Sequence, residues 1–204
     1  MKRWQKYRRK QNLNRNLVKK YPFLLPRNRF SGEPPDDYDY SYTEWDLMDV
    51  DQGWYKMISL LIKDLRKELI RCNYLKNYRI MQVKEKYGGL RWYSGGIPID
   101  CEADRIADDY EYLSNYVCCK CGSLEAHNVN VFGWYTTICR DCFNKQMENR
   151  ALKGYKTINY DDLVDPEDIL KEKREWTTHD PVCGEQHHSR DISGIILRLR
   201  KVNK

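Results

Sequence analysis

The chain has 204 residues, of which 41% are hydrophobic and 32% are charged, and its formal net charge is +6. This length allows one main domain and a small module, while the lack of any apolar run near roughly 18 residues excludes a membrane-spanning helix. We therefore expect a soluble intracellular protein without a membrane partner, whose 8 cysteines are reduced.

The first 29 residues form a basic arm, because they contain eleven Lys or Arg residues and no Asp or Glu. Their apolar spacing predicts an amphipathic helix of modest quality. The arm could neutralise phosphates of a nucleic acid, or it could fold back onto the acidic block from Glu33 to Asp51. The candidate contacts with a nucleic acid or a protein partner are Lys2, Arg3, Lys6, Arg8, Arg9 and Lys10.

The next two segments are not expected to be helical. Tyr21 to Pro26 predicts an apolar strap laid over the core, because each proline removes a backbone donor and restricts the residue before it. Pro34 to Thr43 alternates tyrosine with aspartate and predicts an ordered loop or an edge strand. Phosphate mimicry and a carboxylate metal site are alternative roles for this segment.

The strongest helix signal runs from Trp54 to Leu75, with apolar side chains at three- and four-residue steps. We interpret this apolar stripe as ordinary core. Cys72 lies on the stripe, and nothing near it in the sequence lowers a thiol pKa. It is therefore expected to be a buried and unreactive thiol.

The period then changes to two, and Tyr78 to Tyr93 predicts a β-hairpin. Met81, Val83 and Tyr87 share one face, and the Gly88-Gly89 pair is expected to supply the positive φ angles of the turn. The hairpin could contact a nucleic acid or a partner, or it could be an ordinary half-exposed hairpin. The candidate contacts are Lys84, Lys86, Arg91 and Trp92.

A second helix is expected from Asp100, as its capping residue, to about Tyr116. Asp104, Asp108 and Glu111 line one of its faces. They could hold a divalent ion, although a solvated acidic face is the commoner outcome for such a pattern.

Two cysteine hooks follow, Cys118-x-x-Cys121 and Cys139-x-x-Cys142, with seventeen residues between them. This spacing is typical of a structural zinc site, because soft thiolates favour zinc and four of them leave no open position. A pair of disulfides or a redox motif is the alternative. The sequence therefore predicts zinc as the cofactor, with Cys118, Cys121, Cys139 and Cys142 as ligands.

The residues around the hooks predict a treble-clef arrangement. Gly122 suits a tight knuckle, the residues around Gly133 suggest a short hairpin, and Phe143 to Arg150 suggests a helix. This layout resembles a GATA-type zinc finger, with the four cysteines on that family's ligand positions. Nothing like that family's basic base-contacting stretch follows Gly133. We therefore expect a structural module and not one that recognises a DNA duplex by its sequence.

The last part of the chain predicts a third helix from Asp165 to about Trp176, then a polar loop and a terminal strand from Ile192 to Val202. The loop gathers residues that could form a second metal site, or it could be a polar loop alone. Those residues are His179, Cys183, His187 and His188.

Taken together, these elements predict an α+β fold, with a helix, hairpin, helix core, a treble-clef-like zinc module and a basic N-terminal arm. The expected divisions are residues 1–29 for the arm and strap, 30–117 for the core, 118–156 for the zinc module, and 157–204 for the terminal helix, His/Cys loop and strand.

Three stretches resemble a family of uncharacterised proteins from bacteriophages and prophages of Gram-positive bacteria. They are YPFLLPRN from Tyr21, DYDYSYTE from Asp37 and, above all, KEKYGGLRWY from Lys84, followed by a cysteine-glycine knuckle. The resemblance covers roughly residues 1 to 145. It implies a small phage protein in the cytoplasm of an infected bacterium, and it carries no known activity.

Three functions are compatible with these features. The first is a zinc-stabilised binding protein that engages a host protein or nucleic acid, for example to inhibit a defence system or transcription. The second is a metal-dependent enzyme acting on a nucleic acid or nucleotide, although no phosphate-binding glycine loop, nucleophile elbow or deaminase motif is present. The third is a virion or assembly component.

Overall fold

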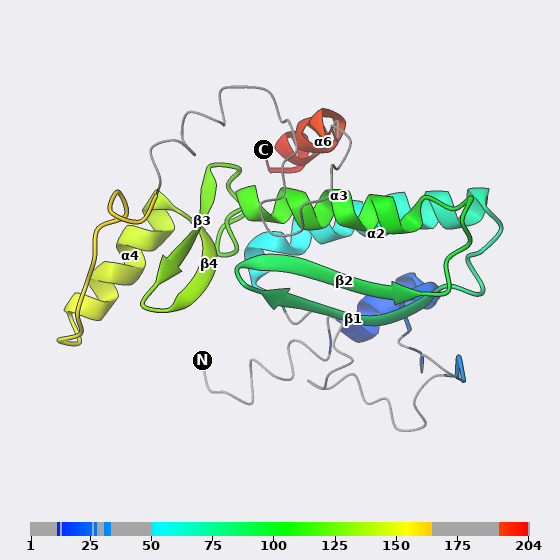
Figure 1. Ribbon diagram of the computed structural model, residues 1–204, viewed down its shortest axis with the longest axis horizontal. Helices are drawn as coiled ribbons and strands as arrows, with labels where there is room; N and C mark the ends of the chain where they lie inside the picture. Colours follow the sequence, from blue (N-terminus) through cyan, green and yellow to red (C-terminus); the bar gives the residue numbers. More distant parts are fainter. Residues whose placement is uncertain are drawn as a thin grey trace.

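The computed structural model describes residues 12, 14–25, 27, 31–33, 50–164 and 192–203 (Figure 1). Helices α2 and α3 lie side by side along one face of the hairpin β1–β2, and a second hairpin, β3–β4, lies beside them with helix α4. The fold is therefore α+β, as the sequence predicts, with two separate two-stranded antiparallel sheets in the described residues. In this part of the chain, no helix combines the length and the apolar character that crossing a bilayer requires.

Helix α2 (Tyr55–Arg71) is the centre of the main core. Its apolar stripe buries Met57, Ile58, Leu61, Leu65 and Leu69 completely or almost so. A short 3-10 helix, η2 (Gln52–Trp54), leads into it, and the buried Trp54 indole donates to the carbonyl of Val117 at 2.7 Å. The predicted helix is confirmed, and it ends at Arg71 rather than Leu75.

The predicted hairpin is formed by strands β1 (Arg79–Lys86) and β2 (Gly89–Gly95). Lys86 pairs with Gly89, so the turn consists of Tyr87 and Gly88, with φ of 52° and 79°. The expected Gly88-Gly89 turn is wrong by one residue, because Gly89 already belongs to β2. Val83, Leu90 and Trp92 are buried, whereas Tyr87 is exposed and Met81 only half-buried next to a register shift.

Helix α3 (Ala103–Leu113) packs on α2 and continues into η3 (Ser114–Tyr116). Its N-cap is Glu102, not the predicted Asp100. The Glu68 carboxylate accepts the backbone N–H of Glu102 at 2.8 Å, and the Arg71 guanidinium donates to the Asp100 carbonyl at 2.9 Å. These contacts from α2 fix the helix start two residues later than local sequence suggests.

Cys72 is not the free buried thiol that the sequence predicts. It is the C-cap residue of α2, half-buried, and it forms a disulfide with Cys101, which precedes α3. Because α2 and α3 are antiparallel neighbours, the C-terminal end of one helix lies beside the N-terminal end of the other. The sequence gives no sign of this pairing, since the two residues are 29 positions apart.

The N-terminal strap packs on the core, but it is not fully extended. Residues 14–20 are helical, and η1 (Pro22–Leu24) is a 3-10 turn that buries Phe23 and Leu24. The Phe23 ring packs edge-on against Tyr78 with centroids 5.8 Å apart. The arm residues Lys2 to Lys10 and the segment Pro34 to Thr43 lie outside the described residues.

The C-terminal segment is helix α6 (Ser193–Asn203), so the predicted terminal strand is wrong. Ile192, Ile196 and Leu199 are buried at helical spacing against the main core. The Arg198 guanidinium also donates two hydrogen bonds to the Asp64 carboxylate on α2, at 2.7 and 2.6 Å. The predicted helix from Asp165 to Trp176 lies outside the described residues.

Candidate metal centre

The second hairpin and its helix form a small module with its own hydrophobic cluster. Strands β3 (Ala126–Val131) and β4 (Trp134–Cys139) meet at a Phe132-Gly133 turn, and helix α4 (Arg140–Ala151) follows directly. The predicted hairpin is confirmed, and the helix predicted from Phe143 begins three residues earlier. The residues buried in the module's hydrophobic cluster include Val129, Ile138, Phe143, Met147 and Tyr160.

The first cysteine pair lies on a tight knuckle after η3. The N–H of Gly122 donates to the carbonyl of Cys118 at 2.8 Å, and the N–H of Cys118 donates to the carbonyl of Ser123 at 2.7 Å. Gly122 has φ of +83°, and a Cβ there would lie 2.8 Å from the carbonyl oxygen of Gly53. Only glycine fits this position, for both backbone conformation and space.

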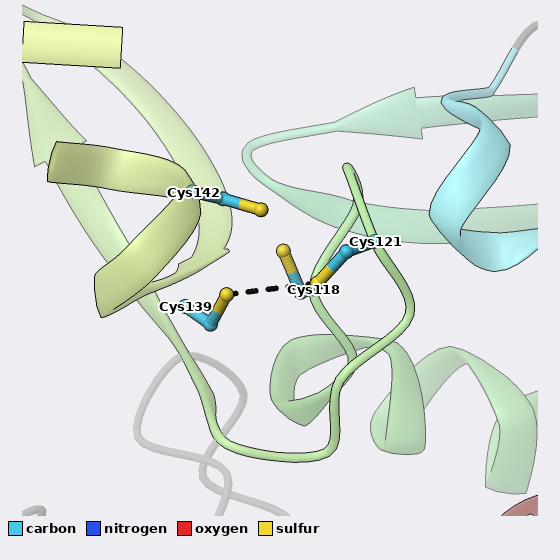
Figure 2. Close-up of side chains that lie close together, drawn as sticks. All are labelled: Cys118, Cys121, Cys139 and Cys142. Atoms are coloured by element: carbon cyan, nitrogen blue, oxygen red, sulfur yellow. Dashed lines mark hydrogen bonds between the residues drawn. The ribbon is translucent and has the colours of Figure 1, made fainter. Parts of the chain in front are cut away.

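The second pair lies at a strand-to-helix junction. Cys139 is the last residue of β4 and the N-cap of α4, and Cys142 stands in the first turn of that helix. Two residues three apart across a helix start point to the same side, toward the knuckle. Figure 2 shows all four side chains directed at one common centre.

The four sulfur atoms lie close enough together to share one metal ion. The Sγ atoms of Cys118, Cys121, Cys139 and Cys142 all lie within 4.8 Å of one another, and those of Cys121 and Cys139 are 3.6 Å apart. A tetrahedron with metal–sulfur bonds of about 2.3 Å has sulfur–sulfur edges of about 3.8 Å. The four cysteines could therefore hold a metal ion, as their spacing predicts, and none of them is paired in a disulfide.

The environment of the sulfurs determines how such an ion would bind. Burial raises the pKa of the Cys118 thiol, but backbone N–H groups of Cys139, Cys121 and Lys120 donate to its sulfur and bring the pKa below its ordinary value. Burial raises the pKa of Cys139 to about 11 and also raises that of Cys142. A cation must displace these protons, so metal binding weakens in acid.

The fifth cysteine of the module, Cys119, is not a ligand. Its sulfur is buried and lies 3.6 Å from the Thr136 hydroxyl. Burial raises the pKa of this thiol to about 12. The N–H of Cys119 donates to the Thr137 carbonyl at 2.9 Å and its carbonyl accepts the N–H of Gly53 at 2.8 Å, so its backbone connects the module to the main core.

The module is also attached to the turn of the first hairpin. The Thr137 hydroxyl donates to the Gly88 carbonyl at 2.7 Å, and the Asn128 amide donates to the Tyr87 carbonyl at 2.8 Å. A Cβ at Gly88 would lie 2.6 Å from Asn128 Oδ1. The sequence predicts both hairpins but not this contact between them, because it joins residues more than forty positions apart.

The other candidate residues are distributed differently. Lys84, Lys86 and Arg91 lie on the outward face of β1–β2, as their alternation suggests. The prediction that Trp92 contacts a partner is wrong, because Trp92 is only 5% exposed and its indole donates to the Tyr78 hydroxyl at 2.7 Å. His179, Cys183, His187 and His188 lie outside the described residues.

The acidic face of α3 does not form a metal site in the described part of the chain. Glu111 accepts the backbone N–H of Trp92, and Asp104 accepts the hydroxyl of Ser94. Besides the cysteine quartet, the described residues contain one further group of possible ligands, which is Glu68 with the disulfide-bonded Cys72 and Cys101.

Comparisons of the chain with protein-family models, with curated proteins and with solved structures find no match.

Proposed function

We propose that this chain is a zinc-stabilised binding protein, in which the metal holds the fold and other surfaces bind the partner. The observation that carries this proposal is the convergence of four cysteine sulfurs, which all lie within 4.8 Å of one another. Thiolate sulfur is a soft ligand that selects zinc or iron–sulfur chemistry over calcium and magnesium. Zinc is the simpler occupant, because a single ion in a knuckle and helix-start arrangement completes the site.

A zinc ion in this quartet is structural. Its four coordination positions are all occupied by protein sulfur, which leaves no position for a substrate or a reactive water. Its position also suits a structural role, since the knuckle leads from η3 of the main core and β4 leads into α4. The ion would thereby join the knuckle to the start of α4 within the small module, next to the main core.

The binding partner that we propose is a host protein or nucleic acid in the bacterial cytoplasm, in the phage setting that the sequence resemblance implies. Two features support a binding role. The first 29 residues carry eleven cationic side chains and no acidic ones. In addition, large aromatic side chains are exposed at the hairpins, including Tyr87, Trp134 and Tyr135.

The experiment is affinity capture from host lysate with the full chain as bait, with and without nuclease. The expected result is one macromolecule enriched reproducibly over a bait whose small module is unfolded by the double substitution Cys139→Ser/Cys142→Ser. A matched bait that lacks residues 1–20 tests whether the arm contributes. No enrichment with the folded bait would contradict the proposal, and so would turnover of a nucleotide or nucleic acid by the purified chain.

A further inference from the structure

Both hairpin turns contain an unusual residue at the first turn position. The turns are Tyr87-Gly88, with φ of 52° and 79°, and Phe132-Gly133, with φ of 52° and 89°. Two consecutive positive φ angles suit Asn-Gly far better than a bulky side chain followed by glycine. An aromatic residue at such a position strains the backbone, and strain of this kind gathers at functional surfaces.

Tyr87 is held rigidly but contributes little to the core. Its carbonyl accepts the hydrogen bond from Asn128, whereas its side chain is 66% exposed. The ring meets that of Tyr135 edge-on, with centroids 6.3 Å apart and planes at 89°. Tyr135 is itself 50% exposed, so two perpendicular rings from different hairpins meet at one corner and both remain partly exposed to solvent.

The sheet face next to this corner is basic. Three cross-strand pairs share the face of β1–β2 opposite Val83 and Trp92, which are Gln82 with Tyr93, Lys84 with Arg91, and Lys86 with the buried Gly89. None of these six residues is acidic. The nearby Glu85 carboxylate accepts the N–H of Gly88, and Glu111 lies 3.6 Å from Arg91 and partly offsets its charge.

Cations and rings alternate along this face. Lys84 Nζ lies 5.3 Å from the centroid of Tyr93, and Lys86 Nζ lies 5.2 Å from that of Tyr87. We call Lys84, Lys86, Tyr87, Tyr93 and Tyr135 the hairpin strip. A strip that interleaves ammonium groups with exposed rings matches a chain of phosphates and unstacked bases.

We propose that the hairpin strip binds single-stranded nucleic acid. The bases stack on Tyr87 and Tyr135, and Lys84 and Lys86 neutralise the phosphates. A duplex does not fit this mode, because its bases already stack on one another. A protein partner fits less well, since protein interfaces are depleted in lysine. This inference rests on the proposed binding function and names the ligand class and the surface.

The test is fluorescence anisotropy with one labelled oligonucleotide, offered to the zinc-loaded full chain as single-stranded DNA, single-stranded RNA and duplex. We expect both single strands to bind at least about tenfold more tightly than the duplex, because only they offer free base faces.

Three variants test the strip itself. Tyr87→Asn removes the ring while it improves the turn, so affinity should fall about tenfold although the protein becomes more stable. Tyr135→Ala should lower affinity by a similar factor. Lys84→Glu with Lys86→Glu should weaken binding and reduce the salt slope of the affinity by about 1 to 2.

Matched controls come from exposed residues away from the strip. Tyr155→Ala removes a ring that is 60% exposed on the loop after α4, and Lys63→Glu with Arg66→Glu reverses two exposed charges on α2. Both controls should bind within about twofold of the wild type. Zinc content and thermal unfolding of every variant confirm that the fold is intact.

Three results would overturn the inference. They are unchanged affinity of Tyr87→Asn and Tyr135→Ala, equal affinity for duplex and single strand, or a nuclease-resistant protein partner lost only when the strip is mutated. The last result would assign the strip to a protein partner and leave the proposed binding function standing. Failure of the lysate capture itself would instead remove the binding function.

Discussion

At the scale of single residues, Glu68 shows how one carboxylate organises its surroundings. It accepts two hydrogen bonds from Arg71, at 2.8 and 2.6 Å, and a third from the N–H of Glu102 at 2.8 Å. The hydrogen bonds from Arg71 are the largest influence and lower the pKa of Glu68 to about 2, against the opposing effect of burial. The hydrogen bonds at the junction of α2 and α3 therefore favour the ionised form of Glu68.

This arrangement predicts part of the acid sensitivity of the fold. Because the folded pKa lies below the ordinary value of 4.5, the ionised carboxylate stabilises the protein at neutral pH, and this stabilisation is lost as pH falls from about 4.5 toward 2. Glu68→Gln should lower the unfolding free energy by about 1 to 2 kcal/mol at neutral pH and by less in acid. Urea titrations across this pH range measure the difference. A constant difference between the variant and the wild type at all pH values would contradict the assignment.

Gly88 provides a second prediction at this scale, with a matched control in the other hairpin. Both Gly88 and Gly133 have positive φ, but a Cβ at Gly88 would meet Asn128 at 2.6 Å, whereas nothing lies within 4 Å of one at Gly133. Gly133→Ala therefore adds backbone strain alone, about 1 kcal/mol, and Gly88→Ala adds crowding, for a loss of about 2 to 3 kcal/mol. Chemical denaturation measures both. Equal losses would show that the contact between the hairpins is absent in solution.

At the scale of elements, the sequence predicts those whose signal is local. The stripe of α2 repeats over five turns, and the two glycine-containing turns mark both hairpins, so these elements could be expected in advance. The cysteine hooks are equally local. The start of α3 could not be placed to the residue, because Glu68 and Arg71 on another helix determine it.

The elements that were missed depend on distant partners. The apolar segment from Ile192 to Val202 was expected to be a strand, but its buried residues Ile192, Ile196 and Leu199 have helical spacing, and α6 packs on α2 through them. The Cys72–Cys101 pair is another case, since only the antiparallel packing of α2 and α3 brings the two residues together. Trp92 is a different case, because it was named as a candidate contact although its alternation with Arg91 and Tyr93 already places it on the buried face of the sheet.

The attachment of α6 leads to a prediction at the element scale. Arg198 binds the Asp64 carboxylate through two hydrogen bonds, and the buried Tyr110 donates to the same carboxylate at 2.6 Å. Arg198→Ala should increase amide hydrogen exchange throughout α6 and lower the unfolding free energy by about 1 kcal/mol, since the pair is partly exposed. Arg200→Ala, an exposed neighbour on the same helix, is the control. If both variants exchange alike, the ion pair does not hold the helix.

At the scale of the whole molecule, the main core and the small module have separate hydrophobic clusters, and the cysteine quartet belongs to the module. In the knuckle, the Cys119 carbonyl accepts the N–H of Gly53. Just before the knuckle, the Val117 carbonyl accepts the indole N–H of Trp54. The second hairpin in turn holds the Tyr87-Gly88 turn through Asn128 and Thr137. Loss of the ion should therefore loosen the module first and then the turn of the first hairpin, where the hairpin strip is displayed.

Two cysteines of the knuckle, Cys121 and Cys119, allow the loss of a metal ligand to be distinguished from the loss of any cysteine side chain. Cys121→Ser removes a ligand and should abolish stoichiometric zinc binding and unfold β3–β4 and α4, because ligand loss removes folding free energy directly. Cys119→Ser changes the neighbouring non-ligand and should keep one zinc ion per chain. Native mass spectrometry with circular dichroism measures both properties. Zinc retained by Cys121→Ser, or lost by Cys119→Ser, would reassign the ligands.

Whether a metal ion holds the fold together is tested by amide hydrogen exchange of the full chain before and after a chelator removes zinc at neutral pH. We expect that one bound zinc ion is removed, and that exchange then rises in β3, β4 and α4 and at the Tyr87-Gly88 turn, while α2 keeps most of its protection. A chain that binds no metal, or whose exchange is the same with and without the ion, would show that no ion stabilises this protein.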